Sequence, residues 1–454
     1  MKKIALSLAL VGLLALSGQA SAVICTIDQV PAATLLLPYF EVDLSNPNGL
    51  TTLFSINNAS QIEVLTHVTV WSDLSVVVLD FDVYLTGFDV QTINMRDILI
   101  SGLLPQTKTA DQGAPVLSPT GPKSFESAVL TGADGNCGAV LPPPTLSAAF
   151  VAHLQQSLTG KADALFGGLC FGQALGDNIA RGYITIDTVN NCTLRSPGDL
   201  GYFAAGGTGD ATNQNLLWGD WVIVNAAQNF AQGSDLVHIE AAISTGSGGG
   251  NNFAFGVYGA DPNVTTSGRY TFYGRYTGGP PNFFTAIDNR EPLATTFATR
   301  YLNGGTFSGG TSLLVWRDSK VNQAPFACPV NPGVRPCWYP LGQEGIVIFD
   351  EQENPFTPSV QPISPQPPGT TLIPFPAETQ RTVVNGASFP VPFNFGWLFL
   401  DLNTTVACAS TRPPVDPAAA QAYVVSTLAS NGHFAVGIDA IRLDSACAAN
   451  HFVP

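Results

Sequence analysis

Charged side chains are scarce in this chain. They form 11% of its 454 residues, whereas soluble domains typically contain about 25%. Lysine and arginine together number 18, and the formal net charge is -15. Binding to nucleic acid through its phosphates needs clustered Lys and Arg, and the sequence contains no such cluster. We therefore expect no nucleic-acid partner.

Common catalytic and metal-binding motifs are missing as well. The sequence contains no G-x-S-x-G, no H-E-x-x-H, no Walker loop, no C-x-x-C and no EF-hand loop. These absences weaken the familiar hydrolase and metalloprotease interpretations without excluding enzymes of other kinds. We expect no cofactor and no metal site.

The first 22 residues are typical of a secretory signal peptide. Lys2 and Lys3 precede the apolar run IALSLALVGLLAL, and Ala20 and Ala22 satisfy the small-x-small rule for cleavage, so the mature chain is expected to start at Val23. The apolar run is shorter than the roughly 20 residues of a membrane span, and no cysteine for a lipid anchor lies beside the cut. We expect a secreted or periplasmic protein without a transmembrane segment in its mature chain.

Glycine (45 residues) and proline (34) are abundant, as in a turn-rich β protein. Most segments alternate with a period of two, which is typical of strands with one buried face. In residues 64–71, for example, Val64, Thr66, Val68 and Val70 share one face. Clusters such as SNPNG separate these segments and indicate turns. We expect a mainly β fold of immunoglobulin-like β-sandwich type.

The chain also resembles itself, which indicates a duplication. PAATLLLPYFEVDLSNPNGLTTLFSI from Pro31 aligns with PLATTFATRYLNGGTFSGGTSLLVW from Pro292, HVTVWSD at 67 with IVIFDEQ at 346, and VYLTGFDVQTINM at 83 with LIPFPAETQRTVV at 372. Towards the end of each copy, GYITIDTVNN aligns with HFAVGIDAIRLDS. Two related β-sandwich domains are the simplest account of this order.

Each copy is predicted to carry one helix. The first spans TLSAAFVAHLQQSLTG and is capped by Thr145. The second follows a cap at Asp416 and Pro417 and stops at Asn431-Gly432.

Eight cysteines follow the cleavage site, and an even number in an exported chain predicts a disulfide framework. The predicted bridges are Cys137–Cys192 and its equivalent Cys408–Cys447, the local pair Cys328–Cys337, and the remaining pair Cys25–Cys170. Cys170 lies in the sequence GLCFG, which resembles a nucleophile elbow. In an oxidising compartment, however, a bridged cysteine is the better interpretation.

We expect the following organisation: a signal peptide (1–22), a first β-sandwich repeat (23–200), a β-rich connecting segment (201–285) and a second β-sandwich repeat (286–454). The connecting segment is either a third β module or a hairpin layer that extends one sandwich. The sequence does not decide between them.

The connecting segment holds the candidate binding residues Trp218, Asp220, His238, Glu240, Tyr270 and Tyr276. In an extended strand over 217–225, Trp218 and Trp221 face opposite sides and cannot form one stacking platform. His238 and Glu240 lie about 7 Å apart, two strand residues along one face, and suit either cross-strand packing or a ligand. The strand RYTFYGRY places Tyr270 and Tyr276 on one face, where they either fill a core or receive a sugar ring.

Two acidic clusters suggest a glycosidase, since that chemistry needs two carboxylates about 5 to 9.5 Å apart. They are FDEQEN, with Asp350, Glu351 and Glu353, and DNREP, with Asp288 and Glu291. Both clusters look equally like residues of turns and strand ends. No residue is therefore assigned a catalytic role.

Phrases such as LWGDW, FAQGSDLVHIEA, FYGRY, DNREPL, VWRDSK, FDEQENP and FGWL resemble a group of uncharacterised exported bacterial β-rich proteins. The resemblance implies bacterial export and a shared fold, and it transfers no functional residue. Export, duplication, disulfides and low charge favour a non-enzymatic surface or matrix protein that acts in binding or scaffolding, with a glycan or another surface protein as its partner. The alternative is a secreted glycan-binding or glycan-hydrolysing protein with an aromatic and carboxylate cleft near the connecting segment.

Overall fold

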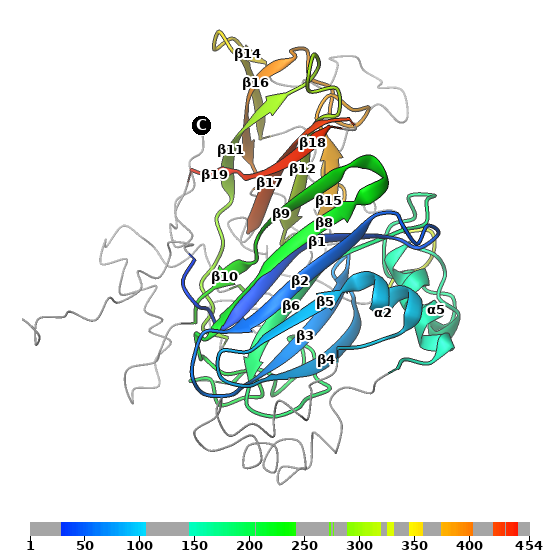
Figure 1. The fold of residues 1–454 in the computed structure, drawn as a ribbon, viewed down its shortest axis with the longest axis vertical. Coiled ribbons are helices and arrows are strands. Elements are labelled where there is room, and N and C mark those ends of the chain that lie inside the picture. Colours follow the sequence, from blue (N-terminus) through cyan, green and yellow to red (C-terminus); the bar gives the residue numbers. More distant parts are fainter. Residues whose placement is uncertain are drawn as a thin grey trace, which may run out of the picture.

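The computed structural model describes residues 29–105, 145–204, 206–241, 272–273, 276, 288–318, 325–330, 345–356, 374–402, 421–431 and 433–443. In these residues, strands form four antiparallel sheets accompanied by two α-helices (Figure 1). The prediction of a mainly β fold is confirmed. No helix in the described ranges has the length and apolar character needed to cross a membrane.

The first two sheets contain the strands from β1 to β10. One sheet has the order β10-β1-β6-β3-β4, and the other has the order β5-β2-β8-β9 with β7 beside β2. The strand bounds are β1 Thr34–Asp43, β2 Thr51–Asn58, β3 Val64–Ser72, β4 Val77–Leu85, β5 Val90–Asn94, β6 Ile179–Val189, β7 Leu217–Trp218, β8 Asp220–Asn225, β9 Phe230–Asp235 and β10 Val237–Ile239. Apolar side chains from both sheets belong to one buried cluster. We call these two sheets the first sheet pair.

The strand predicted at 64–71 is β3, but it is buried on both faces rather than one. Val68 and Val70 join the main apolar cluster. On the opposite face, the His67 ring lies 5.5 Å from the Tyr202 ring, and Trp71 stacks on Tyr276. Residues from distant parts of the chain therefore cover the face that alternation alone assigns to solvent.

The remaining two sheets, which we call the second sheet pair, have the orders β14-β13-β16-β11-β19 and β15-β12-β17-β18. The strand bounds are β11 Thr296–Leu302, β12 Gly310–Arg317, β13 Ile346–Asp350, β14 Pro355–Phe356, β15 Thr379–Val383, β16 Phe395–Asp401, β17 Ala422–Ser430, β18 Phe434–Asp439 and β19 Ile441–Arg442. A second apolar cluster lies among these strands.

Both sheet pairs have the same strand order when β11 is read in the place of β1. The sheet β10-β1-β6-β3-β4 then corresponds to β19-β11-β16-β13-β14, and β5-β2-β8-β9 corresponds to β15-β12-β17-β18. By this order β6 corresponds to β16, so the alignment of GYITIDTVNN with HFAVGIDAIRLDS is wrong. Many apolar strands share the same alternating pattern, so the pattern alone does not identify which strands correspond. The neighbours of each strand in its sheet do.

One glycine position is shared by the two pairs. A Cβ atom at Gly182 of β6 would lie 2.0 Å from the carbonyl oxygen of Trp71 in β3. A Cβ atom at Gly396 of β16 would lie 1.8 Å from the carbonyl oxygen of Phe349 in β13. Both contacts exclude any side chain larger than hydrogen without a shift of the backbone.

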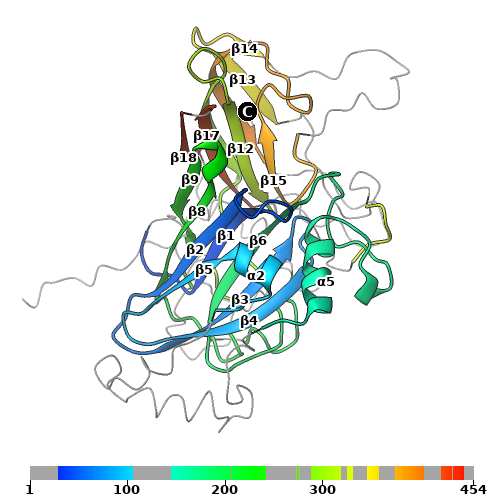
Figure 2. The same ribbon diagram turned by 45° about the vertical axis from the view of Figure 1, so that its right-hand side comes forward.

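The helix predicted at 145–160 is α5, which spans Ala148–Leu158. Its cap is Ser147, whose side chain accepts from the backbone N–H of Phe150, rather than Thr145. A further helix, α2 (Met95–Ser101), was not predicted; Asn94 caps its start, and Gly102 ends it in the left-handed region at φ 68°. α2 and α5 pack against each other beside the first sheet pair (Figures 1 and 2).

The second predicted helix is wrong over its described part, because residues 422–430 form the strand β17. β17 pairs with β12 on one side and β18 on the other and is almost wholly buried. A strand buried on both faces is apolar throughout and lacks the alternation that distinguishes it from a buried helix. The predicted cap at Asp416 lies outside the described residues.

The connecting segment does not form a separate layer in its described strands. β8 pairs with β2, β9 pairs with β8, and β10 pairs with β1. The stretch 217–239 therefore adds strands to both sheets of the first pair.

Cys170 is bridged, as predicted, but its partner is Cys328. The predicted pairs Cys25–Cys170 and Cys328–Cys337 are therefore wrong. The backbone N–H of Cys170 donates to Phe326 O, and the N–H of Phe326 donates to Cys170 O, both at 2.7 Å, so the fold brings two segments 158 residues apart side by side. Cys192 is also disulfide-bonded, and its partner lies outside the described residues. The pair Cys408–Cys447 lies outside them altogether.

Candidate functional site

The sheet β15-β12-β17-β18 is a layer shared by both sheet pairs. On one face, Leu313 and Val315 of β12 belong to the apolar cluster of the second pair. On the other face, Leu314 and Trp316 of the same strand belong to the cluster of the first pair. Burial on both faces makes this layer part of two cores.

Aromatic rings fill the junction between this layer and the first sheet pair. Trp71 stacks on Tyr183 and on Tyr276, each at 5.6 Å between ring centroids, and Trp316 stacks on Phe272 at 5.4 Å. The cavity among these rings measures only about 10 Å³, room for about one water molecule. Tyr276, a predicted sugar-binding residue, is therefore a half-buried packing residue whose hydroxyl lies 3.0 Å from Ser75 Oγ. Tyr270 lies outside the described residues.

A buried ion pair also crosses the junction. Arg381 of β15 donates from Nη2 to Glu41 Oε2 of β1 (2.9 Å) and from Nε to Oε1 (3.2 Å). The Tyr39 hydroxyl donates to Glu41 Oε1 at 2.5 Å. Burial alone would raise the pKa of the Glu41 carboxyl, but the charge and hydrogen bonds of Arg381 lower it from its ordinary value. The carboxylate is thus held as a structural anion.

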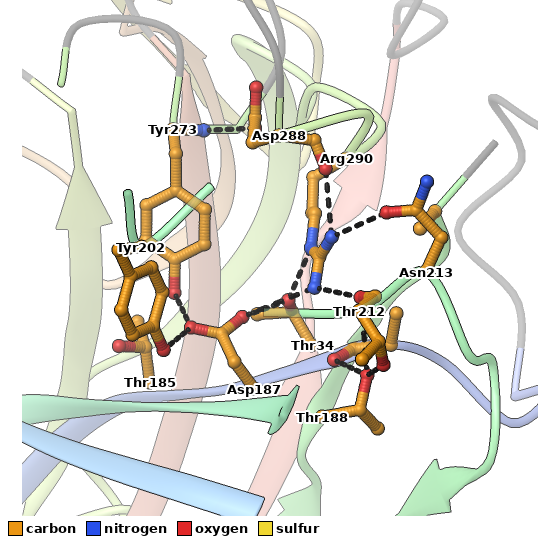
Figure 3. A network of polar contacts seen from close by, with 12 residues as sticks. Thr34, Thr185, Asp187, Thr188, Tyr202, Thr212, Asn213, Tyr273, Asp288 and Arg290 are labelled. Atoms are coloured by element: carbon orange, nitrogen blue, oxygen red, sulfur yellow. Dashed lines mark hydrogen bonds and ion pairs between the residues drawn. The ribbon is translucent and has the colours of Figure 1, made fainter. Parts of the chain in front are cut away.

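Figure 3 shows a second buried network, centred on Arg290. Its side chain is fully buried. It donates from Nε to Thr34 Oγ1 (2.9 Å), from Nη2 to the carbonyl of Thr212 (2.8 Å) and from Nη1 to Asn213 Oδ1 (3.1 Å). Arg290 thereby fixes the segment 288–290 against β1 and against the loop that follows β6.

Asp187 of β6 completes this network. Its carboxylate accepts from the hydroxyls of Tyr202 (2.8 Å) and Tyr273 (3.0 Å), and it lies 3.7 Å from Arg290 Nη2. Burial and the negative charge of Asp187 raise the pKa of both phenols well above the ordinary value. These tyrosines therefore act as hydrogen-bond donors to a buried carboxylate.

His153, Asp163 and Ser157 form a group that superficially resembles a catalytic triad. In a triad, the serine and the aspartate contact different nitrogens of the histidine ring. Here both contact Nδ1, with Ser157 Oγ at 3.2 Å, while Nε2 lies 3.1 Å from the carbonyl of Val78. All three side chains are buried. The group ties α5 to β4 and to the turn at Asp163, and it presents no nucleophile.

His67 of β3 is also fully buried, beside Asp82 of β4, with Nδ1 and Oδ1 2.9 Å apart. Burial favours a lower pKa for His67, but the hydrogen bond and charge of Asp82 outweigh it and raise the pKa. Burial also raises the pKa of the neighbouring Asp80 carboxyl. The backbone N–H of Thr193 donates to the other oxygen of Asp82 at 3.1 Å, so this pair holds the loop after β6.

The candidate residues of the connecting segment do not form one site in the described structure. Trp218 is 44% exposed and Trp221 is 2% exposed, so the rings lie on opposite sides, as the alternation predicts. Asp220 accepts from Ser55 Oγ at 2.5 Å. His238 and Glu240 are buried next to β1, where His238 Nδ1 lies 2.7 Å from the carbonyl of Val30. These contacts support the core interpretation of this stretch.

The carboxylates considered for glycosidase chemistry are scattered. Asp288 is buried and accepts from the backbone N–H of Tyr273 (2.9 Å), and Glu291 accepts from the N–H of Glu240 (3.3 Å). Asp350 ends β13 and accepts from two backbone N–H groups of the exposed turn that leads to β14. Glu353 occupies the same turn at φ 64°. Such scattering does not support a catalytic pair built from these residues.

Helices α2 and α5 pack together beside the first sheet pair (Figure 2). An open polar cleft adjoins α5. It encloses about 340 Å³, within the range of roughly 300–1,000 Å³ typical of ligand sites. Its lining residues are Leu44, Ser45, Ala152, Gln155, Gln156, Lys161 and Asn178. We call it the α5 cleft, and it is the candidate binding site of the described chain.

The walls of the α5 cleft are held rigidly. Arg96 of α2 donates to the carbonyl at the end of β1 and to three carbonyls of the turn between β1 and β2, among them those of Asn46 (2.7 Å) and Leu50 (2.8 Å). Gln155 of α5 donates to the carbonyl of Leu99 in α2 at 2.8 Å. Lys161 Nζ donates to Asn178 Oδ1 at 3.0 Å. The cleft is thus formed before any ligand arrives.

Sequence reasoning missed this cleft. Its residues come from three separate stretches of the chain and belong to no motif. One feature of the sequence could have drawn attention to it: Lys161 is the only lysine between Lys123 and Lys320 in a strongly acidic sequence.

Within the described ranges, no group of three or more His, Cys, Asp or Glu side chains is placed to hold a metal ion. Comparisons of the chain with protein-family models, with curated proteins and with solved structures find no match.

Proposed function

We propose that this is an exported, non-enzymatic protein that acts in binding or scaffolding at a cell surface or in an extracellular matrix. The observation that carries this proposal is the layer β15-β12-β17-β18, which is buried on both faces and joins the two sheet pairs. A layer that is packed on both faces suits a scaffold, because pre-organisation lowers the entropic cost of binding.

The same proposal includes two related β-sandwich domains that arose by duplication. Support comes from the shared strand order and from repeated sequences at corresponding positions. GYITID at 182–187 in β6 matches GWLFLD at 396–401 in β16, and FAQGSD at 230–235 in β9 matches FAVGID at 434–439 in β18. Asp187 pairs with Thr34 of β1 in the register in which Asp401 pairs with Thr296 of β11.

Export through the predicted signal peptide at 1–22 remains part of this proposal. The Cys170–Cys328 bridge is consistent with an oxidising compartment. The bridge also fastens the loop after α5 to residues 325–330, which lie in the chain between β12 and β13.

The experiment is a binding screen of the oxidised mature protein against immobilised surface polysaccharides and purified exported proteins of the native bacterium. Each captured ligand is afterwards analysed by mass spectrometry. Stable capture of an unaltered ligand supports the proposal. Steady conversion of any ligand to product contradicts it. The proposal is also contradicted if the protein captures no ligand in the screen and, when cells are fractionated, is absent from the surface and matrix fractions.

A further inference from the structure

The α5 cleft lies in the part of the molecule that distinguishes the two sheet pairs. Residues 95–178 connect β5 to β6, whereas only residues 384–394 connect the corresponding strands β15 and β16. Five of the seven residues that line the cleft belong to this long connection. Long connections on a rigid scaffold are where binding residues concentrate.

The charge of the cleft is unusual for this chain. Lys161 is the only lysine in the described residues of a chain whose formal net charge is -15. The nearby Arg181 is engaged by Asp177 through two hydrogen bonds at 2.8 and 2.7 Å. An anionic group entering the cleft therefore finds the ammonium group of Lys161 as its main cationic partner.

The remaining polar lining suits hydroxyl groups. Ser45 Oγ already donates to the Asp43 carboxylate at 2.7 Å and Gln155 donates to the carbonyl of Leu99, so Ser45 and Gln155 offer a ligand their oxygens as acceptors. The amide oxygens of Gln156 and Asn178 already accept from Ala164 and Lys161, so these two side chains offer their NH2 groups as donors. A phosphate site is typically built from arginine forks or several backbone N–H groups, and the lining contains no arginine. A ligand with one carboxylate and many hydroxyls matches this lining better than a bare anion does.

We propose that the α5 cleft binds a carboxylated saccharide, with Lys161 contacting the carboxylate and the surrounding amides contacting the hydroxyls. This inference rests on the proposed binding function and names its ligand class. The volume of about 340 Å³ is close to the lower end of the roughly 300–1,000 Å³ range, so the cleft receives one or two sugar units rather than a long chain.

The test is isothermal titration calorimetry of the oxidised mature protein with three probes: trigalacturonic acid, the neutral trisaccharide maltotriose, and inorganic phosphate. Trigalacturonic acid is expected to bind with an affinity that falls as salt rises, because one charged contact is screened. Maltotriose is expected to bind at least tenfold more weakly, and phosphate is expected not to compete at millimolar concentration.

Three variants locate the site. Lys161→Met removes the charge and is expected to weaken trigalacturonic acid binding about tenfold, because the ligand's carboxylate loses its charged hydrogen-bond donor. Lys161→Arg keeps the charge and is expected to recover most of that loss. Ala152→Trp fills the cleft from α5 without removing a polar group and is expected to abolish binding.

The matched control is Arg300→Met. Arg300 is a partly exposed arginine on β11, in the second sheet pair, paired with Glu351. The substitution removes the same unit of charge far from the cleft and is expected to leave binding unchanged. Circular dichroism of every variant verifies the fold.

The proposal is overturned if trigalacturonic acid does not bind, or if it binds equally well to the Lys161→Met and Ala152→Trp variants. Equal affinity for maltotriose, or full competition by phosphate, also overturns the stated ligand class. Failure here remains distinct from failure of the proposed function. A chain that ignores trigalacturonic acid yet captures another surface ligand unaltered loses only this inference, whereas turnover of trigalacturonic acid overturns the non-enzymatic function.

Discussion

The two sheet pairs share a strand order but differ in what surrounds it. In the first pair, Asp187 of β6 is fully buried and accepts hydrogen bonds from two tyrosines and a threonine. In the second pair, Asp401 of β16, at the corresponding register position, is only half-buried. The first pair has an additional covering that includes Tyr202, Tyr273 and Arg290.

This difference separates the common framework from its elaboration. The framework includes the glycines at 182 and 396, where a strand approaches its neighbour too closely for a side chain. The elaboration includes α2, α5, the Cys170–Cys328 bridge and the α5 cleft, all built on the long connection of the first pair. Substitutions in these additional elements should therefore change the unfolding free energy more than substitutions at matching positions of the second pair.

The largest effect is expected from Arg290→Met. The substitution leaves Asp187 buried without its cation, and breaking a buried ion pair costs roughly 3–5 kcal/mol in unfolding free energy. Arg300→Met is the control in the second pair, where the arginine pairs with an exposed glutamate and its loss is expected to cost less than about 1 kcal/mol. Urea unfolding measures both, and equal costs would remove the distinction between the pairs.

Removal of the Cys170–Cys328 bridge is expected to have the next largest effect. The double variant Cys170→Ser and Cys328→Ser releases a link between residues 158 positions apart, and we expect a loss of roughly 2–4 kcal/mol, mainly because the unfolded chain gains entropy. Urea unfolding under oxidising conditions measures the loss. A variant as stable as the parent protein would show that the bridge does not constrain the chain.

The junction between the pairs depends on Glu41 and Arg381. Glu41→Gln is expected to lower the unfolding free energy by roughly 2–3 kcal/mol, because it removes the charge from a buried hydrogen-bonded pair. The double variant Glu41→Leu and Arg381→Leu is expected to be less destabilised than either single variant, since it leaves no buried charge unpaired.

The same pair gives the parent protein an acid-sensitive component of stability. The folded pKa of Glu41 lies below its unfolded value, so the contribution is complete above the unfolded pKa of about 4.3 and is lost as pH falls through the folded pKa. Unfolding curves between pH 3 and 6 test this. A Glu41→Gln variant with the same pH dependence as the parent would exclude Glu41 as the source.

His67 is expected to produce the smallest effect, with the opposite sign. Its folded pKa is raised, so its contribution is complete below the unfolded pKa of about 6.5 and is lost as pH rises through the folded pKa. His67→Gln should flatten the stability profile on the alkaline side of pH 6.5. His433→Gln, at an exposed position just before β18, is the control for the same change of residue type.

Local signals in the sequence predict some elements well. β3 follows from alternation, and α5 follows from helix-end signals, although its cap is Ser147 rather than Thr145. β17 does not, because AYVVSTLAS is buried on both faces and carries no period that separates strand from helix. α2 was missed because it has only seven residues.

Contacts between distant residues set the rest. Cys170 meets Cys328 because Phe326 pairs with the backbone of Cys170, and no spacing rule reports such a contact. The α5 cleft joins Ser45, Gln155 and Asn178, which have ordinary polar side chains in three separate stretches. The candidates His238 and Glu240 fit a site by type, but the fold buries them beside β1.

The most direct test of the shared layer is peptide-resolved hydrogen exchange of the oxidised mature protein across a urea series. We predict that peptides from β6 and β17 lose protection at the same urea concentration, because β17 is part of the core on both of its faces. Loss of protection in β16 and β17 at a clearly lower urea concentration than in β6 would contradict a single rigid body.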